Sequence, residues 1–211
     1  MADITKSVNG TPIWITGEGP PLILVHGVLM DHRMWAGQVA MLSDNYRVIC
    51  LDMLGHGDAP NPPGERTLAD FTGQIEEVIA ECCADARPVL GGFSMGGLIT
   101  QAFGAKRHSD LAGLIILNAV YDRTPDEAAL VRDRSRMMVA EGVKATVDGA
   151  RARWFREDEV ATHGAMIEEI CGWMEDGDFS AKCKAHWVFA TSDDQVAGSL
   201  GNISCPTLIM T

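Results

Sequence analysis

The segment Pro88-Val89-Leu90-Gly91-Gly92-Phe93-Ser94-Met95-Gly96-Gly97 decides the fold. Its first half is a short apolar run that predicts a buried strand, and Met95 to Lys106 is predicted as a helix. Ser94 therefore stands where a strand passes directly into a helix. A serine on such a tight turn adopts a strained backbone conformation, which leaves room only for small neighbours and exposes the hydroxyl. We predict that Ser94 is a nucleophile, supported by Gly92 and Gly96.

A second loop is expected to lie beside this turn. The run Leu22-Ile23-Leu24-Val25 is apolar throughout, as in strands covered on both faces of a parallel sheet, and it leads into His26-Gly27-Val28. The carboxyl ends of parallel strands meet at one edge of a sheet. We therefore predict an oxyanion hole formed by the backbone N–H groups of Met95 and Val28, with His26 and Gly27 as supporting residues.

Strands and helices alternate through the first part of the chain. Apolar runs at 46–51, 88–93 and 111–117 are separated by predicted helices, such as the one at 67–84. This alternation predicts an α/β fold with a mostly parallel sheet. We assign residues 1–120 to the core, the charge-rich helical stretch 121–200 to an inserted cap, and 201–211 to a return strand of the core.

Composition excludes several classes of partner. The chain has 17 Lys and Arg against 29 Asp and Glu, a formal charge of -12, which argues against nucleic-acid binding. No stretch approaches the roughly 18 to 20 apolar residues of a membrane span. Met1 to Gly10 lacks a signal-peptide pattern, so a cytoplasmic protein is expected. The six cysteines show no metal-ligand spacing, and we predict reduced, mostly buried thiols and no bound metal.

Three motifs resemble the α/β-hydrolase family, in order and at its usual separations. They are Leu24-Val25-His26-Gly27, Asp52-x-x-Gly55-His56-Gly57 and Gly92-Phe93-Ser94-Met95-Gly96-Gly97. The segment Arg153-Trp154-Phe155 and the serine at the nucleophile position make the chain most similar to 3-oxoadipate enol-lactonases and haloperoxidase-like esterases. This resemblance implies a hydrolase that needs no cofactor. Haloalkane dehalogenases and epoxide hydrolases are disfavoured, because they require Asp in place of Ser94.

The resemblance also implies a catalytic acid and a histidine base, in chain order after the serine. Both are expected after Thr211, so we expect a chain truncated before the last strand and almost inactive by itself. Asp122, in the loop after the run at 111–117, is an alternative position for the acid. A homo-oligomer or a complementing C-terminal segment are the macromolecular partners that the sequence leaves open.

The remaining candidates have structural alternatives. We expect His26 to orient the oxyanion loop, His56 to cap its glycine-rich loop and His108 to cap the helix that follows Ser94, while His32 borders the pocket. We expect His163 and His186 to be surface or lid residues. One or two arginines of the cap are candidates to bind a substrate carboxylate, against the alternative of a solvated helix face. They are Arg132, Arg134, Arg136, Arg151, Arg153 and Arg156.

The favoured function is hydrolysis of a small-molecule carboxylic ester or lactone through an acyl-enzyme on Ser94. Two rival activities use the same serine, namely carbon-carbon bond hydrolysis and peracid formation. A third alternative is a binding protein without turnover, since fold alone does not establish activity.

Overall fold

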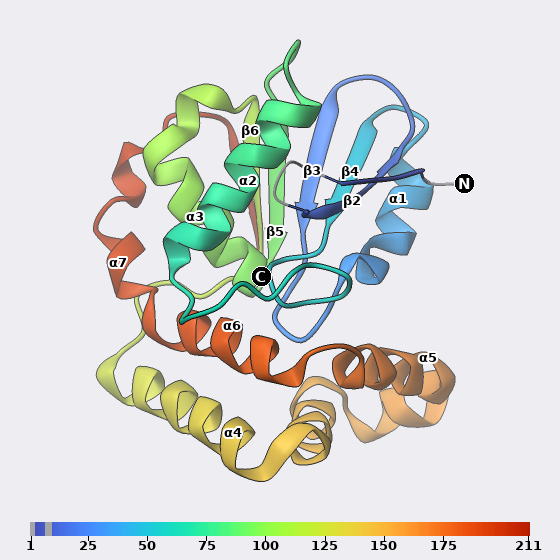
Figure 1. Ribbon diagram of the computed structural model, residues 1–211, viewed down its shortest axis with the longest axis vertical. Helices are drawn as coiled ribbons and strands as arrows, with labels where there is room; N and C mark the ends of the chain where they lie inside the picture. Colours follow the sequence, from blue (N-terminus) through green and yellow to red (C-terminus); the bar gives the residue numbers. More distant parts are fainter. Residues whose placement is uncertain (1–2, 7–9) are drawn as a thin grey trace.

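The structure is a computed structural model that describes residues 3–6 and 10–211. Within this part of the chain one seven-stranded sheet has the order β1-β2-β4-β3-β5-β6-β7 (Figure 1). The first two pairings, β1 with β2 and β2 with β4, are antiparallel, and the others are parallel. This confirms the predicted α/β class. The strands are β1 (Asp3–Lys6), β2 (Pro12–Thr16), β3 (Pro21–Val25), β4 (Arg47–Leu51), β5 (Val89–Phe93), β6 (Gly113–Leu117) and β7 (Thr207–Met210).

The central strand β3 is buried at all five positions, as its apolar run predicts. Successive side chains of a strand point to opposite faces. Ile23 and Val25 accordingly join the core under helices α2 (Leu68–Cys82) and α3 (Met95–Arg107). Leu22 and Leu24 join a second core against helix α1 (Ala36–Leu42). The sheet is therefore covered on both faces. Edge strand β1 was not predicted, because Asp-Ile-Thr-Lys contains no apolar run.

The core helices begin close to their predicted positions. Helix α2 starts after Thr67, whose hydroxyl accepts from the amide of Asp70 while the Asp70 carboxylate accepts from the amide of Thr67, a capping box. Helix α3 begins at Met95, directly after β5. The core helices are η1 (His32–Trp35), α1 (Ala36–Leu42), α2 (Leu68–Cys82), α3 (Met95–Arg107) and η2 (His108–Asp110).

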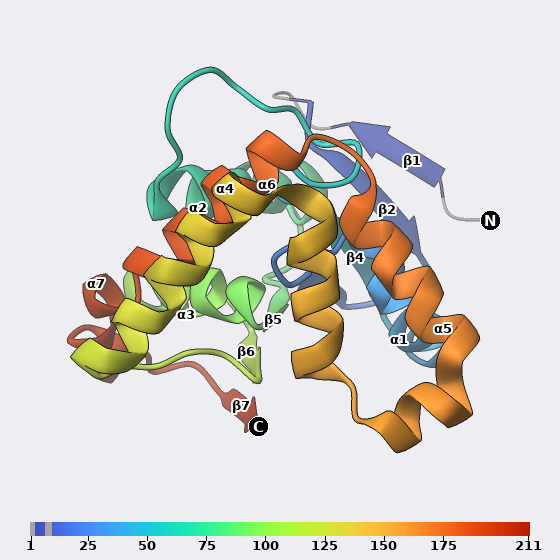
Figure 2. The same ribbon diagram turned by 90° about the horizontal axis from the view of Figure 1, so that it is seen from below.

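A second group of helices lies between β6 and β7 in the chain. Helices α4, α5 and α6 form a layer at one end of the sheet, below the core in Figure 1, and α4 and α6 run side by side in Figure 2. Helix α4 bends at Gly142, whose φ of 82° is not helical. The elements are α4 (Pro125–Trp154), α5 (Glu157–Glu175), α6 (Phe179–Thr191), α7 (Asp194–Ala197) and η3 (Leu200–Asn202).

Strand β7 pairs with β6 and leaves Leu208, Ile209 and Met210 exposed. In the described part of the chain, no helix combines the length and apolar character needed to cross a membrane. All six cysteines are free thiols.

Candidate active site

Ser94 occupies the turn between β5 and α3. Its φ of 53° and ψ of -112° lie in a region that residues with a side chain rarely adopt. The turn is held on both sides, because the Ser94 amide donates to the Leu117 carbonyl at 2.9 Å and the Ser94 carbonyl accepts from the Leu98 amide at 3.1 Å. The predicted strand-to-helix turn with a strained serine is present in the structure.

The flanking glycines are required by close backbone contacts. A Cβ at Gly92 would lie 2.2 Å from the carbonyl oxygen of Gly96, and a Cβ at Gly96 would lie 2.3 Å from the carbonyl oxygen of Val25. Both contacts are with backbone atoms, which cannot move aside as a flexible side chain does. This crowding explains the glycine on each side of Phe93-Ser94-Met95.

The loop after β3 approaches the serine through the sheet register. Val25 is paired with Gly92, so the chain leaves β3 next to the Ser94 turn. Leu29 has a φ of 68°, and the Met30 amide donates to the Gly27 carbonyl at 3.2 Å, which closes a tight turn. Among the described residues, the amides of Val28 and Met95 have no hydrogen-bond acceptor. The oxyanion hole expected at these two amides stays a prediction.

Two buried histidines fasten this loop to the loop after β4. His26 Nε2 accepts from the Met53 amide at 2.9 Å, so the proton is on Nδ1, which donates to the Gly27 carbonyl at 2.8 Å. His56 Nε2 accepts from the Leu29 amide at 3.1 Å. Burial lowers the pKa of His26, and burial followed by the neighbouring His26 lowers the pKa of His56 well below its ordinary value. Both imidazoles are neutral crosslinks, with no nitrogen left over for the serine.

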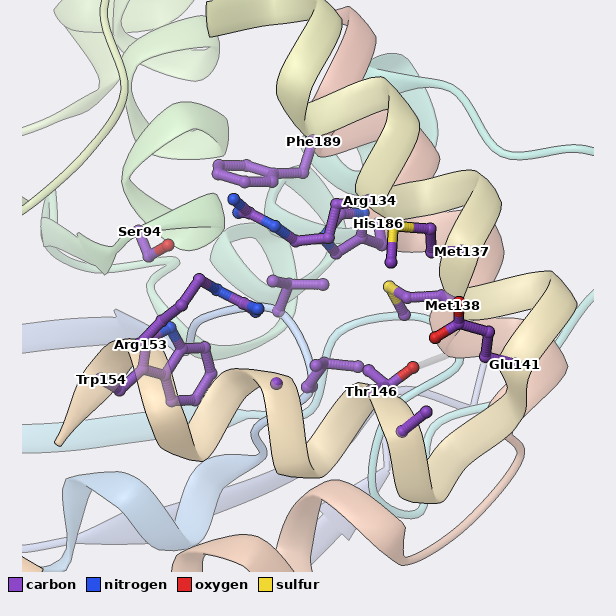
Figure 3. Close-up of a pocket in the computed structure, with 14 residues that line it drawn as sticks. Ser94, Arg134, Met137, Met138, Glu141, Thr146, Arg153, Trp154, His186 and Phe189 are labelled. Atoms are coloured by element: carbon purple, nitrogen blue, oxygen red, sulfur yellow. The ribbon is translucent and has the colours of Figure 1, made fainter.

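A cavity of about 220 Å³ opens in front of Ser94. The core contributes Ser94, Val28 and Leu29, and the remaining lining comes from α4 and α6 (Figure 3). The lining is mostly apolar with a few polar groups, the usual character of a small-molecule site. The α4 and α6 residues are Arg134, Met137, Met138, Glu141, Ala145, Thr146, Gly149, Arg153, Trp154, His186 and Phe189.

Two of the six candidate arginines reach this cavity. Arg134 lies before the bend at Gly142 and Arg153 lies after it, and Figure 3 shows their side chains extending into the cavity from opposite sides. Burial lowers the pKa of Arg153, and the charge of Arg134 lowers it further. Within the described residues neither arginine has an ion-pair partner. By contrast, Arg136, Arg151 and Arg156 bind carboxylates of Asp133, Glu168 and Asp158.

The histidine predictions are corrected in two places. For His186 the surface alternative is wrong, because the residue is only 4% exposed and lines the Ser94 cavity from α6, with Nδ1 2.6 Å from Ser135 Oγ; the lid alternative stays a prediction. His32 does not border that cavity but stacks on Trp14 and lines a separate one. His163 is exposed, and His108 occupies the C-cap position of α3.

The alternative acid and the residues with metal-binding atoms lie apart from the serine. Asp122 is exposed and does not line the Ser94 cavity. Among the described residues, Asp31, His32 and Asp52 bring three ligand atoms within 4.8 Å of one another. The carboxylate oxygens of the two aspartates already accept hydrogen bonds. Asp31 accepts from Arg33 at 2.6 Å, and Asp52 accepts from His32 Nδ1 at 2.9 Å and from the Asp58 amide at 3.0 Å. This cluster is a structural network around the two loops.

No sequence pattern distinguishes Arg134 and Arg153 from the other four candidate arginines, and none predicts that His186 lines the cavity. The one available signal was Gly142, a glycine in the middle of a long helical stretch, which marks a bend in the segment that carries both arginines. Burial of His186 depends on Ser135, 51 residues away, and no local pattern reports it.

Comparison with known proteins agrees with this geometry. The model of the alpha/beta hydrolase family matches residues 22–209. The (E)-2-((N-methylformamido)methylene)succinate hydrolase of Acinetobacter baylyi is 34% identical over 199 residues, which are 92% of this chain and 72% of that protein. The 3-oxoadipate enol-lactonase 2 of the same organism is 26% identical over 193 residues, covering 92% and 70%.

A solved structure shows the same fold. The enol-lactonase from Burkholderia xenovorans superimposes with a TM-score of 0.85 at 26% identity, covering 98% of this chain and 80% of that one. The family match extends over most of the chain, and the relatives named here are hydrolases. The strained serine turn, the sheet order and these similarities lead to one conclusion: the chain belongs to the alpha/beta hydrolase family.

Proposed function

We propose that this protein is a serine hydrolase that cleaves a carboxylic ester or lactone of a small molecule carrying a carboxylate group. The observation that carries the proposal is the cavity in which the Ser94 hydroxyl opens toward two arginines without carboxylate partners among the described residues. A nucleophile and an anion-binding group in one small cavity fit a substrate that has both a reactive carbonyl and a negative charge.

The proposed mechanism begins with attack of Ser94 Oγ on the substrate carbonyl. The carbonyl oxygen becomes an oxyanion that accepts from the Val28 and Met95 amides, and the N-terminus of α3 adds its partial positive charge. The alcohol or enol oxygen leaves, and water then hydrolyses the acyl-enzyme. A general base is required, and we assign it to no described residue. His186 is unsuited to this role, because burial and the nearby arginines lower its pKa to about 4.

The charge of the cavity supports the carboxylate-bearing substrate. Arg134 is half-buried and Arg153 is exposed, and although Glu141 lines the same cavity, neither arginine has an ion-pair partner among the described residues. Both guanidinium groups can therefore bind a substrate carboxylate. Two relatives are named for anionic compounds, a substituted methylenesuccinate and 3-oxoadipate enol-lactone. The first of these names contains an amide-type group, so cleavage of an amide bond is the second candidate reaction. An oxyanion hole stabilises the tetrahedral intermediate of ester and of amide hydrolysis alike.

Covalent labelling tests the serine directly. A fluorophosphonate probe should add one adduct, detected by intact-protein mass spectrometry, to the full-length wild-type protein and none to its Ser94→Ala variant. Ser109→Ala is the matched control, because Ser109 is exposed and lies outside the cavity. Absence of an adduct on the folded wild-type protein would favour a binding protein without turnover.

Substrate charge tests the arginines. Hydrolysis of a monoester of succinate should have a lower KM than hydrolysis of the uncharged dimethyl ester. Arg153→Gln should reduce the ratio of the two KM values about tenfold or more, because it removes a charge-assisted hydrogen bond to the carboxylate. Arg136→Gln, on the outer surface, should leave it unchanged. Equal KM values for both esters in the wild-type protein would contradict the carboxylate site. Identification of the reaction products distinguishes ester hydrolysis from the two rival activities, carbon-carbon bond hydrolysis and peracid formation.

A further inference from the structure

We infer that Arg123 is a positioning residue for the Ser94 cavity: its guanidinium holds the Phe189 ring in place as a wall, and this wall limits the size of the group that fits beside Ser94. This role rests on the proposed function and adds to it a limit on substrate size. Arg123 lies in the loop between β6 and α4 and does not line the cavity itself, so it acts through Phe189, which does.

Arg123 contacts Phe189 in two ways. Its Nη1 group donates to the Phe189 carbonyl at 2.9 Å, and its guanidinium carbon lies 4.5 Å from the centroid of the Phe189 ring. The carbonyl is one of the last four of α6, which have no partner within the helix. A guanidinium over the face of a ring is a cation–π contact. The backbone and the ring of Phe189 are therefore held by the same group.

Asp193 fixes this guanidinium over the ring. The Asp193 carboxylate accepts from Arg123 Nη1 at 2.8 Å and from the Arg123 amide at 2.9 Å, and the Arg123 and Asp193 side chains are only 8% and 7% exposed. Displacement of either side chain would leave an unpaired charge away from water, which is costly. Arg123 therefore has one defined position behind the Phe189 ring.

The loop that carries Arg123 is tied to the helix that follows Ser94. Gln101 of α3 is 4% exposed, and its Nε2 donates to the Val120 carbonyl at 3.1 Å, three residues before Arg123. Figure 3 shows the Phe189 ring at the wall of the cavity into which Ser94 opens. Buried contacts thus connect the nucleophile helix, through this loop, to the ring that faces the same cavity.

The cavity is small enough for the position of one wall to decide what fits. Its volume of about 220 Å³ is below the roughly 300 to 1,000 Å³ of ordinary small-molecule sites. Because Arg123 packs on one face of the Phe189 ring, the ring cannot swing toward the loop without displacing the buried ion pair. A larger substrate group meets a wall that does not yield, whereas a ring without this support can turn aside.

Labelling of the full-length protein with dimethyl and diisopropyl fluorophosphate tests the inference. Ser94 Oγ forms a bond to phosphorus with release of HF, and the two alkyl groups of each probe are identical, so the larger groups occupy both sides of the serine. The measured quantity is the ratio of the labelling rates, diisopropyl over dimethyl, followed by intact-protein mass spectrometry. A loss of stability alone would change both rates together and leave this ratio unchanged.

Two substitutions should raise the ratio. Arg123→Lys keeps a charge for Asp193 but removes the planar group over the ring, and the ratio should rise about threefold or more. Phe189→Leu removes the ring itself, and the ratio should rise about tenfold. Adding Arg123→Lys to Phe189→Leu should cause no further rise, because a residue that acts through another has no effect once the other is gone.

Arg136→Lys is the matched control. Arg136 lies 5.9 Å from the ring of Trp187, also on α6, but neither residue lines the Ser94 cavity, so the ratio should stay unchanged. Asp193→Asn is a second variant, which loosens the Arg123 guanidinium from its other side and should shift the ratio in the same direction as Arg123→Lys.

Two results would overturn the inference while leaving the nucleophile in place. One is an unchanged ratio in folded Arg123→Lys, or in Asp193→Asn if the lysine variant does not fold. The other is an equal rise when Arg123→Lys is added to Phe189→Leu, which would mean that Arg123 does not act through the ring. Absence of labelling at Ser94 by both probes would overturn the proposed function and, with it, this role of Arg123.

Discussion

Replacing Gly96 with alanine tests whether the turn that carries Ser94 depends on bare backbone at this position. Gly96 is the second residue of α3 and faces the end of β3, where the loop with Val28 begins. An added Cβ would lie 2.3 Å from the Val25 carbonyl oxygen and 2.6 Å from the His26 carbonyl oxygen. The substitution adds one methyl group and removes no hydrogen bond, so its effect measures the close approach itself.

The expected cost follows from the overlap. Close carbon–oxygen contacts in proteins are about 3.3 to 3.6 Å, so α3 and the end of β3 must separate by about 1 Å to admit the methyl group. Overpacking by one methylene costs about 1 to 3 kcal/mol, and both partners here are backbone atoms in a close-packed core. We therefore expect Gly96→Ala to lower the free energy of unfolding by about 3 kcal/mol or more. The same shift should displace the Ser94 hydroxyl and reduce fluorophosphonate labelling.

Urea unfolding followed by circular dichroism measures this cost. With an m value of about 2 kcal/mol/M, a loss of 3 kcal/mol lowers the midpoint by about 1.5 M. Gly172→Ala is the matched control, since Gly172 lies inside α5 with no atom within 4 Å of the added Cβ. Alanine should stabilise that helix by about 0.5 to 1 kcal/mol. A Gly96→Ala midpoint within 0.3 M of wild type would refute the argument from crowding.

Three further predictions concern buried charges. Lys182 is 1% exposed, and its Nζ donates to the carbonyls of Trp173, Met174 and Asp176. Lys182→Met leaves these carbonyls without a donor and should lower the free energy of unfolding by about 3 to 5 kcal/mol in the same urea assay. An unchanged free energy of unfolding would contradict this prediction. Asp193 binds the buried Arg123 at 2.8 Å, and Asp193→Asn should lower the thermal midpoint by several degrees, whereas Asp194→Asn, at an exposed position, should not. The lowered pKa of His186 means that the unfolded chain binds more protons below pH 6.5, so stability falls as pH drops from 6.5 toward 4. From pH 7.5 to pH 5 this residue should account for about 2 kcal/mol of the loss, and an equally steep decline in His186→Gln would show that other groups are responsible.

The serine turn and the sheet class were predictable from sequence because both depend on local constraints. Glycines at 92 and 96 around Ser94 are demanded by backbone contacts at a single strand-to-helix turn. The apolar run at 22–25 is required of any strand buried on both faces. Such patterns depend on neighbouring residues, and they are therefore readable without knowledge of the rest of the chain.

The character of the cavity was decided only by tertiary structure. Six arginines in one helical stretch are equivalent by composition, and the bend at Gly142 brings Arg134 and Arg153 to opposite sides of the same space. His186 is buried because α6 packs on α4 and places it against Ser135. Which side chains face a common cavity depends on packing between distant segments, and this packing sets charge, burial and pKa. The amino-acid sequence alone thus determined the strained serine turn, while the packing of the helices after β6 determined what that turn faces.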